Sequence, residues 1–333
     1  MVKWEILGDE IAKESWDREL SRFEGFTLYQ CYAWGEHSRS FGWVPFRWVA
    51  RENGREIVAM VQALYKPYKI GIGMLWSSGG PVGDVSVWGE GLRQVALEST
   101  GAKGLYYRFF SNRECTQEDE EALESLGWRR CAWKLRSGLS MKLYLDREPE
   151  ELRRGFSRNW RHNLNRSEKA KLRISQWINP DIDEIVAVYQ SMETYKDLKE
   201  QFSRQELESI FQNLAEQIVL YRCDNEIGQL VALRGCCILN QYGWDLFAAT
   251  SVAGRDLYAS YALLWEILQH CQREGVKEYD MMGIDPIKNL GVANFKKGTG
   301  ANLIEYLGEW EWATSRILGW GANLAVRWVR SNT

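Results

Sequence analysis

Hydrophobic and polar positions divide the start of the chain into helix-like and strand-like segments. Apolar residues recur at helical spacing over 16–23 and 30–39, which predicts two helices. Two strand-like runs follow at 46–51 and 57–65, and Asn53-Gly54 between them can supply the positive φ angles of a tight turn. The pattern therefore predicts a β-hairpin after the helix pair.

A glycine-rich stretch at 71–81 interrupts this pattern and predicts a loop. Gly127 marks the end of a later helix, since glycine is common just beyond a helix C-terminus. The elements expected after the loop are a helix over 87–99, a strand over 104–110, a helix over 117–126 and a strand near Trp133. The first half is therefore expected to be a mixed α/β domain.

The segment 148–171 is basic and helical in pattern, and it marks the expected boundary between domains 1–147 and 148–333. The elements predicted beyond it are a strand over 172–177, helices over 182–195 and 204–214, strands over 218–223, 229–239 and 242–249, a helix over 258–274 and a strand over 278–282. Each half thus has a helix pair, a meander of strands, a further helix and a last strand. This order resembles a GNAT-like acyltransferase domain, so the expected fold is α/β (α+β), with two such domains in tandem and a cleft between them.

The composition is that of a folded globular protein, with 45% hydrophobic and 26% charged residues among 333. Lys and Arg total 42 against 45 Asp and Glu, so the net charge of −3 gives no global attraction for a polyanion, and nucleic-acid contact must be local. No run reaches the ~18 apolar residues of a membrane span. The first residues lack the apolar core of a signal peptide. We expect a cytoplasmic monomer, whose membrane contact, if it has one, is peripheral and at the inner face.

Several familiar kinds of chemistry have no motif in this sequence. His37, His162 and His270 lack a metal-binding spacing and no CxxC pair occurs, so no metal site is expected. There is no GxxxxGK[ST] or GxGxxG loop, which argues against nucleotide hydrolysis and dinucleotide binding. No cofactor is therefore expected.

Segments spread along the chain resemble those of one enzyme family. Gln30 followed by Trp34 is similar to a Q-x-x-x-W opening, Gly80-Pro81 resembles a GP loop, and 161–169 resembles an R-x-x-I-R-x-A-x-K helix. The more specific set is C-terminal: Tyr261 to Glu266 on a helix, Tyr279 to Gly283 on the next strand, then Gly291, Phe295-Lys296 and Gly300. Together these motifs resemble the FemABX (FemA/FemB/FemX) peptidyltransferases, which add amino acids to the peptidoglycan stem peptide.

The resemblance implies an aminoacyl-tRNA donor, a muropeptide or lipid-linked muropeptide acceptor and a compact, FemX-like layout. Aminoacyl transfer passes through a tetrahedral oxyanion, which a fixed cation in a water-poor cleft stabilises. Lys296 is the candidate cation, and Phe295 before it can exclude water from the site. The alternative is that Lys296 and Lys297 are solvated surface lysines. Asp280 is the second catalytic candidate, to hold the amine or orient a partner, although a strand-end Asp also caps turns.

Other residues are assigned to substrate by the same resemblance. The acceptor-contacting positions fall on Tyr195, Lys196, Trp244 and Phe247, unless the two on the strand are core residues. Tyr261, Gly283 and Phe295 complete the predicted substrate site. Where the family has a basic residue four positions after Trp34, this chain has Ser38 with Arg39 beside it, and Gly79 replaces the arginine before the GP loop. These departures weaken the prediction of a uridine-diphosphate acceptor, with Arg39 as the remaining basic candidate.

Two further segments carry predictions of contact. Arg158, Arg161, Arg166 and Lys169 share much of one helical face and can meet tRNA phosphates or the acceptor diphosphate, unless they are solvated partners of nearby glutamates. The segment 312–328 is amphipathic and either lies on a membrane or packs back onto the domain.

Two other functions remain open on the sequence. One is a GNAT-type N-acyltransferase that uses acyl-CoA on a cell-envelope sugar or lipid, although 252–260 lacks the Q/R-x-x-G-x-G/A turn that would hold its pyrophosphate. The other is a catalytically silent module that binds a glycan or peptide.

Overall fold

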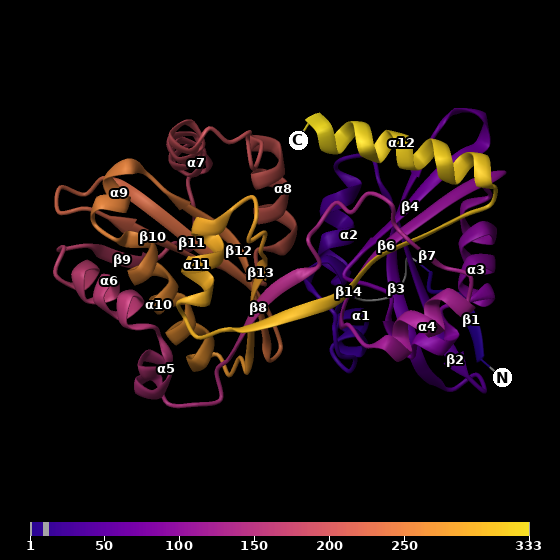
Figure 1. Cartoon of the computed structure of the whole chain (residues 1–333), viewed down its shortest axis with the longest axis horizontal. Coiled ribbons are helices and arrows are strands. Elements are labelled where there is room, and N and C mark those ends of the chain that lie inside the picture. The colour runs from indigo at the N-terminus through magenta and orange to yellow at the C-terminus, as the bar shows by residue number, and fades with distance from the viewer. Residues whose placement is uncertain (1, 9–12, 333) are drawn as a thin grey trace. The chain divides into compact units, whose positions relative to one another are not determined.

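The computed structural model describes residues 2–8 and 13–332, and the chain forms two compact units (Figure 1). Unit 1 runs from the start of the chain to Gly138 and again from Glu305 onward, and unit 2 is Leu139–Ile304. This division differs from the expected boundary at 147/148. The last part of the chain joins unit 1 because strand β14 (Asn302–Ala313) pairs antiparallel with β6 (Gly104–Glu114) of that unit.

Unit 1 is a mixed sheet with helices packed against it. Its strand order is β1 (Val2–Ile6), β2 (Val44–Glu52), β3 (Glu56–Pro67), β4 (Ile72–Ser78), β6 and β14, with β5 (Val82–Gly83) beside β3 and β7 (Arg129–Arg130) beside β14. Its helices are α1 (Lys13–Leu20), α2 (Tyr32–Arg39), α3 (Glu90–Thr100), α4 (Gln117–Ser125) and α12 (Arg316–Asn332), with 3-10 turns η1 (Leu28–Gln30), η2 (Lys69–Gly71) and η3 (Val85–Val87). The core contains Trp48, Trp88, Trp128 and Trp310, each almost fully removed from water.

The predicted hairpin is confirmed as β2 and β3. Asn53 and Gly54 have φ angles of 50° and 70°, the left-handed conformation that the turn requires. Gln30, the first residue of the Q-x-x-x-W motif, is fully buried, and its amide group bonds to the backbone of Gln62 and Ser78. Gln30 therefore ties η1 to β3 and β4, which is a structural role.

The loop predicted at 71–81 is wrong for most of its length, because residues 72–78 form β4. Glycine suits this strand because the Tyr65 ring lies over Gly73, where a Cβ would come within 2.2 Å of the ring. The strand predicted near Trp133 is also wrong. The strands lie before and after Trp133 instead. β7 pairs with β14 and β8 (Leu139–Tyr144) pairs with β13 (Glu278–Gly283), and both partners are distant in sequence.

Unit 2 repeats this plan. Its strand order is β9 (Arg173–Gln176), β10 (Ile218–Asp224), β11 (Leu230–Leu239), β12 (Tyr242–Thr250), β13 (Glu278–Gly283) and β8. Its helices are α5 (Pro149–Gly155), α6 (Arg158–Glu168), α7 (Ile182–Lys196), α8 (Arg204–Leu214), α9 (Val252–Asp256), α10 (Ala259–Arg273) and α11 (Leu290–Lys297). The long basic helix predicted over 148–171 is two helices, because Phe156 is extended and Ser157 caps a new helix at the Trp160 amide.

The two sheets share one topology. In each, an edge strand and a three-stranded meander lead through a helix to a parallel strand, β6 or β13, and an antiparallel strand closes the sheet. The closing strands are exchanged along the chain: β8 follows the helices of unit 1 but closes unit 2, and β14 follows unit 2 but closes unit 1. The expected tandem arrangement of two similar α/β domains is confirmed.

Candidate functional site

The two sheets differ at the parallel strand pair. In unit 1, β4 and β6 stay paired over seven residues, Ile72 to Ser78. In unit 2, β12 and β13 pair only from Tyr242 to Trp244, and beyond that point β12 continues to Thr250 without β13 beside it. The sheet of unit 2 therefore opens at its centre, where backbone and side-chain groups become available to a ligand.

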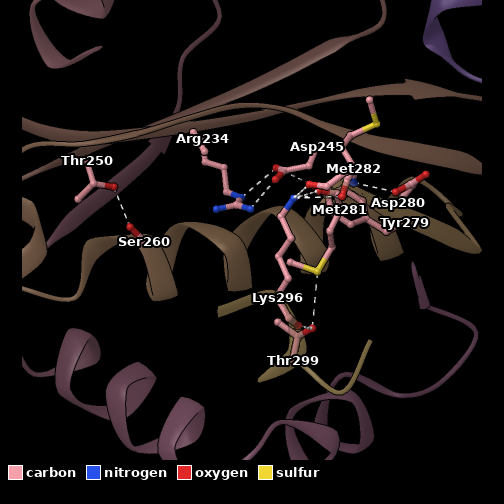
Figure 2. A network of polar contacts seen from close by, with 12 residues as sticks. Arg234, Asp245, Thr250, Ser260, Tyr279, Asp280, Met281, Met282, Lys296 and Thr299 are labelled. Atoms are coloured by element: carbon pink, nitrogen blue, oxygen red, sulfur yellow. Dashed lines mark hydrogen bonds and ion pairs between the residues drawn. The ribbon is translucent and has the colours of Figure 1, made fainter. Parts of the chain in front are cut away.

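Lys296 of α11 reaches the β13 side of this opening (Figure 2). Its side chain is buried, and its Nζ donates to the carbonyl oxygens of Met281, Met282 and Gly283 at 2.5, 3.1 and 3.0 Å. Met282 has a φ of 62°, so the strand turns around the ammonium group. Burial lowers the pKa of Lys296 below its ordinary value, and the negative charge of Asp245 opposes this change.

A buried ion pair lies on the β11 and β12 side of the opening. Arg234 of β11 donates from Nε and Nη2 to the two carboxylate oxygens of Asp245 at 3.0 and 2.6 Å, and the Tyr279 hydroxyl donates to Oδ1 at 3.0 Å (Figure 2). Both charged side chains are less than a tenth exposed. Sequence reasoning missed this pair. The available signal was one charged residue in the middle of each of two neighbouring apolar strands.

A pocket of about 750 Å³ in unit 2 brings these groups together. Five of the predicted site residues line it: Tyr195, Lys196, Tyr261, Phe295 and Lys296. Among the described residues of its lining, the basic side chains are Lys196, Arg234, Arg255, Lys288 and Lys296, whereas Asp245 is the one carboxylate. Because Arg234 already neutralises Asp245, the pocket favours an anionic ligand.

The pocket lining includes an aromatic and basic cluster at the end of α7. The Arg255 guanidinium lies 4.5 Å from the centre of the Tyr195 ring. Lys196 is exposed, but the groups around its amine partly exclude water. This desolvation lowers the pKa of the amine, and the positive charge of Arg255 lowers it further. A bound anion would relieve this repulsion, since opposite charge favours the protonated amine.

Aromatic packing positions α11 against α6 and α10. The Phe295 ring lies 5.1 Å from Tyr261 and 5.8 Å from Trp160, and the Asn163 amide donates to the Tyr261 hydroxyl at 3.0 Å. Lys296 is therefore held by its neighbour in sequence as well as by its own hydrogen bonds. The motif residues Tyr261, Phe295 and Lys296 thus line one pocket.

Other predicted residues lie outside this lining. Asp280 is buried, where it accepts hydrogen bonds from the Ser140 hydroxyl and the Met282 amide, and Gly283 contributes its carbonyl oxygen to Lys296. Trp244 and Phe247 are core residues, 3% and 1% exposed, because their side chains pack against aromatic rings within the unit.

Arg39 belongs to unit 1 and is not among the residues that line the unit 2 pocket. Its Nε donates to Glu36 at 2.9 Å on α2.

The four basic residues predicted to share a helical face lie mainly at the surface, three of them on α6 and Lys169 just after it. Arg158, Arg166 and Lys169 are exposed and Arg161 is half-buried. The nearby acid Glu168 pairs with Arg153, and in the described part of the chain none of the four forms an ion pair. The Arg166 guanidinium lies over the Tyr258 ring at 4.2 Å. The four side chains therefore leave most of their charge available to a polyanion.

A second, larger pocket of unit 2, about 850 Å³, has a different character. Its ionisable side chains are Glu208, Glu216, His270 and Glu274, and no predicted site residue lines it. Over residues 2–8 and 13–332, no cluster of His, Cys, Asp and Glu is placed to hold a metal ion. The basic pocket around Lys296 is therefore the candidate functional site.

Comparison with known proteins shows which of them this chain resembles. Residues 203–327 match the FemAB family. The aminoacyltransferase FemA of Staphylococcus aureus is 35% identical over 65 residues, which is 18% of this chain and 16% of FemA. The crystal structure of FemX superposes with a TM-score of 0.81 at 16% identity, covering 96% of this chain and all of FemX. L-PGS from Bacillus licheniformis gives 0.59 at 16% identity over 96% of this chain and 98% of that one.

A tandem GNAT protein from the clavulanic acid biosynthesis pathway gives a TM-score of 0.54 at 13% identity, over 95% of this chain and 99% of that one. The chain therefore has a tandem GNAT-like fold. The FemAB match over residues 203–327 agrees with the resemblance seen in its C-terminal motifs. The FemAB match encloses β11, β12 and α11, which supply Arg234, Asp245 and Lys296 to the pocket, whereas the lining residues Tyr195 and Lys196 of α7 precede the match. Among the described helices, none is both long and apolar enough to cross a bilayer.

Proposed function

We propose that this chain moves an aminoacyl group from aminoacyl-tRNA to the amine of a peptidoglycan precursor stem peptide, in the pocket of unit 2. The observation that carries the proposal is the buried ammonium of Lys296, which lines a basic pocket where the sheet opens. The named activity of the S. aureus relative, an aminoacyltransferase, supports this class of reaction.

In the proposed reaction, the acceptor amine attacks the ester carbonyl and a C–N bond forms while the carbonyl oxygen becomes negative. Collapse of this intermediate restores the carbonyl and breaks the ester C–O bond. The tRNA hydroxyl leaves with the proton that the amine gives up. Lys296 stabilises the negative oxygen, and a fixed donor in a dry site is worth about 3–4 kcal/mol in such reactions.

The three carbonyl contacts of Lys296 define how it acts. They fix the ammonium in place before substrate arrives. A direct bond to the oxyanion requires one contact to be exchanged. Gly283 is the exposed member of the three and is the partner we expect to be released. We propose that Asp280, close to this turn, favours the charged form of Lys296, since its negative charge raises the pKa of that amine.

The basic groups suit the phosphates and carboxylates of both proposed substrates. Lys196, Arg255 and Lys288 lie on the lining and would meet the anionic groups of the acceptor. The basic residues of α6, Arg158, Arg161 and Arg166, together with Lys169 just after it, would meet tRNA phosphates. Acyl-CoA is also anionic, so the donor has to be decided by assay.

The test combines purified protein with labelled muropeptide precursors and either a mixture of charged tRNAs or a mixture of acyl-CoAs. Label is expected to move only from tRNA. Lys296→Ala should reduce the rate by about a hundredfold or more, whereas the matched control Lys297→Ala, whose side chain is exposed, should retain it.

Binding of the precursor and the far-ultraviolet circular dichroism of both variants show whether they remain folded. Undiminished transfer by a folded Lys296→Ala variant would remove the proposed role of the ammonium. Transfer from acyl-CoA alone would replace the proposed donor.

A further inference from the structure

We propose that unit 1 carries a surface that binds the interface of an anionic lipid bilayer. This bilayer surface combines the outer face of α12 with the turn between β3 and β4. Its apolar members are Tyr68, Ile70, Ile317, Trp320, Leu324 and Trp328, all of them exposed. The inference concerns unit 1 alone and does not depend on the reaction proposed for unit 2.

Helix α12 has two distinct faces. On the inner face, Asn323 donates to the Glu311 carboxylate at 2.7 Å and Gly319 lies against Ala313, so the helix packs on its own unit. On the outer face, Ile317 and Trp320 are 83% and 68% exposed. The apolar side chains recur at helical spacing, which gives one continuous stripe turned toward solvent. Packing onto unit 1 therefore leaves the larger apolar residues of the helix uncovered.

The turn η2 exposes a second apolar side chain, that of Ile70, in an unfavourable backbone conformation. Ile70 is 89% exposed and has a φ of 67° and a ψ of 24°, a conformation that is unfavourable for a β-branched residue. The Tyr68 amide donates to the Ile72 carbonyl at 2.8 Å and closes the turn. A strained, exposed isoleucine contributes no packing within the chain, so its presence is explained by an external apolar contact.

The two elements are neighbours in unit 1. Gly104 of β6 lies between them: a Cβ added there would be 3.5 Å from the Ile72 side chain and 3.5 Å from that of Leu318 at the start of α12. The Lys103 amide also donates to the Gly71 carbonyl at 2.8 Å. The turn therefore lies beside the start of the helix.

The charges on the bilayer surface favour an anionic lipid membrane as its partner. The segments 66–72, 101–104 and 316–332 contain no Asp or Glu, and they expose Lys69, Lys103, Arg316 and Arg327. Tryptophan and basic residues on one amphipathic helix are typical of a helix in the plane of an anionic membrane. A second copy of the chain would bring like charges together. Helix α12 is not both long and apolar enough to cross a bilayer, so it would lie in the plane of the membrane.

The experiment is flotation of the full chain with vesicles of phosphatidylcholine alone or with about 30% phosphatidylglycerol. Wild-type protein should float with the anionic vesicles and be released by salt. Trp320→Ser and Ile70→Ser should each weaken binding about tenfold, since a large apolar side chain is no longer buried. The matched control Ile227→Ser, which removes a 77% exposed isoleucine from unit 2, should bind as wild type does.

Three results would overturn the inference. The first is absence of flotation with the anionic vesicles, and the second is equal flotation of wild type and Trp320→Ser. A dimer in solution that Trp320→Ser abolishes would also overturn it and assign the face to a second copy. Transfer to a water-soluble precursor, measured on the same variants, keeps this result separate from the reaction proposed for unit 2.

Discussion

The buried ion pair beside Lys296 gives the sharpest prediction for stability. Asp245→Asn keeps the shape of the side chain but removes the charge that neutralises Arg234. The carboxylate accepts two bonds from Arg234 and one from Tyr279, and both charged groups are buried. The guanidinium would therefore remain in a dry environment without a counter-charge, which is strongly unfavourable.

The magnitude follows from this geometry. Removing one partner of a buried pair costs about 3–5 kcal/mol, and we expect the lower end because asparagine can still accept one hydrogen bond. Tyr279→Phe removes a single neutral donor and should cost about 1 kcal/mol. Replacing both charged groups, as in Arg234→Met with Asp245→Leu, should cost less than Asp245→Asn alone, because no charge stays buried.

Thermal unfolding of the four proteins, followed by circular dichroism, measures these differences. A loss of about 3 kcal/mol in a domain of this size lowers the melting temperature by roughly 6–12 °C. Tyr279→Phe serves as the control for loss of a hydrogen bond without loss of charge. If Asp245→Asn melts with the wild type, or if the double replacement is the least stable variant, the reasoning about buried charge is refuted.

Two further predictions concern charge at the proposed site. The rate of transfer should fall as pH rises through the pKa of Lys296, because the neutral amine cannot stabilise the oxyanion. This fall should occur below pH 10.5, the ordinary pKa of lysine, since burial favours the neutral amine. The alkaline loss should vanish in Lys296→Arg, and an unchanged pH–rate profile in that variant would contradict the role of the ammonium. Replacing Arg158 and Lys169 by glutamine should lower the slope of log affinity for tRNA against log salt by about 1.4–1.8, as measured by filter binding, and an unaltered slope would exclude contact of this face with phosphate.

Local signals predicted the elements that local interactions determine. Asn53-Gly54 fixed the hairpin, Gly127 followed a helix end, and the spacing of apolar residues located α7, α8 and α10. Glycine was misleading at β4, because Gly73 is needed for the Tyr65 ring above it and not for a turn. That contact joins two strands and has no signature within the segment itself.

The candidate site, like the fold, was predicted from the sequence only in part. The motifs identified Tyr261, Phe295 and Lys296, but not the Arg234–Asp245 pair that completes their surroundings. Single charged residues inside apolar strands indicate burial with a partner, yet sequence alone cannot say which residue the partner is. Trp244 and Phe247 were ambiguous for a related reason, since an aromatic residue on a strand can face either a core or a ligand.

The sequence by itself determined the order of helices and strands, the repeated plan of the two halves and the motif that carries Lys296. Tertiary structure decided which strand closes each sheet, that the parallel pair opens in unit 2 and not in unit 1, and that α12 keeps an apolar face exposed. The physical reason is that element type follows from local backbone preference and periodicity. Strand partners, buried charge pairs and exposure depend on groups far apart in the chain.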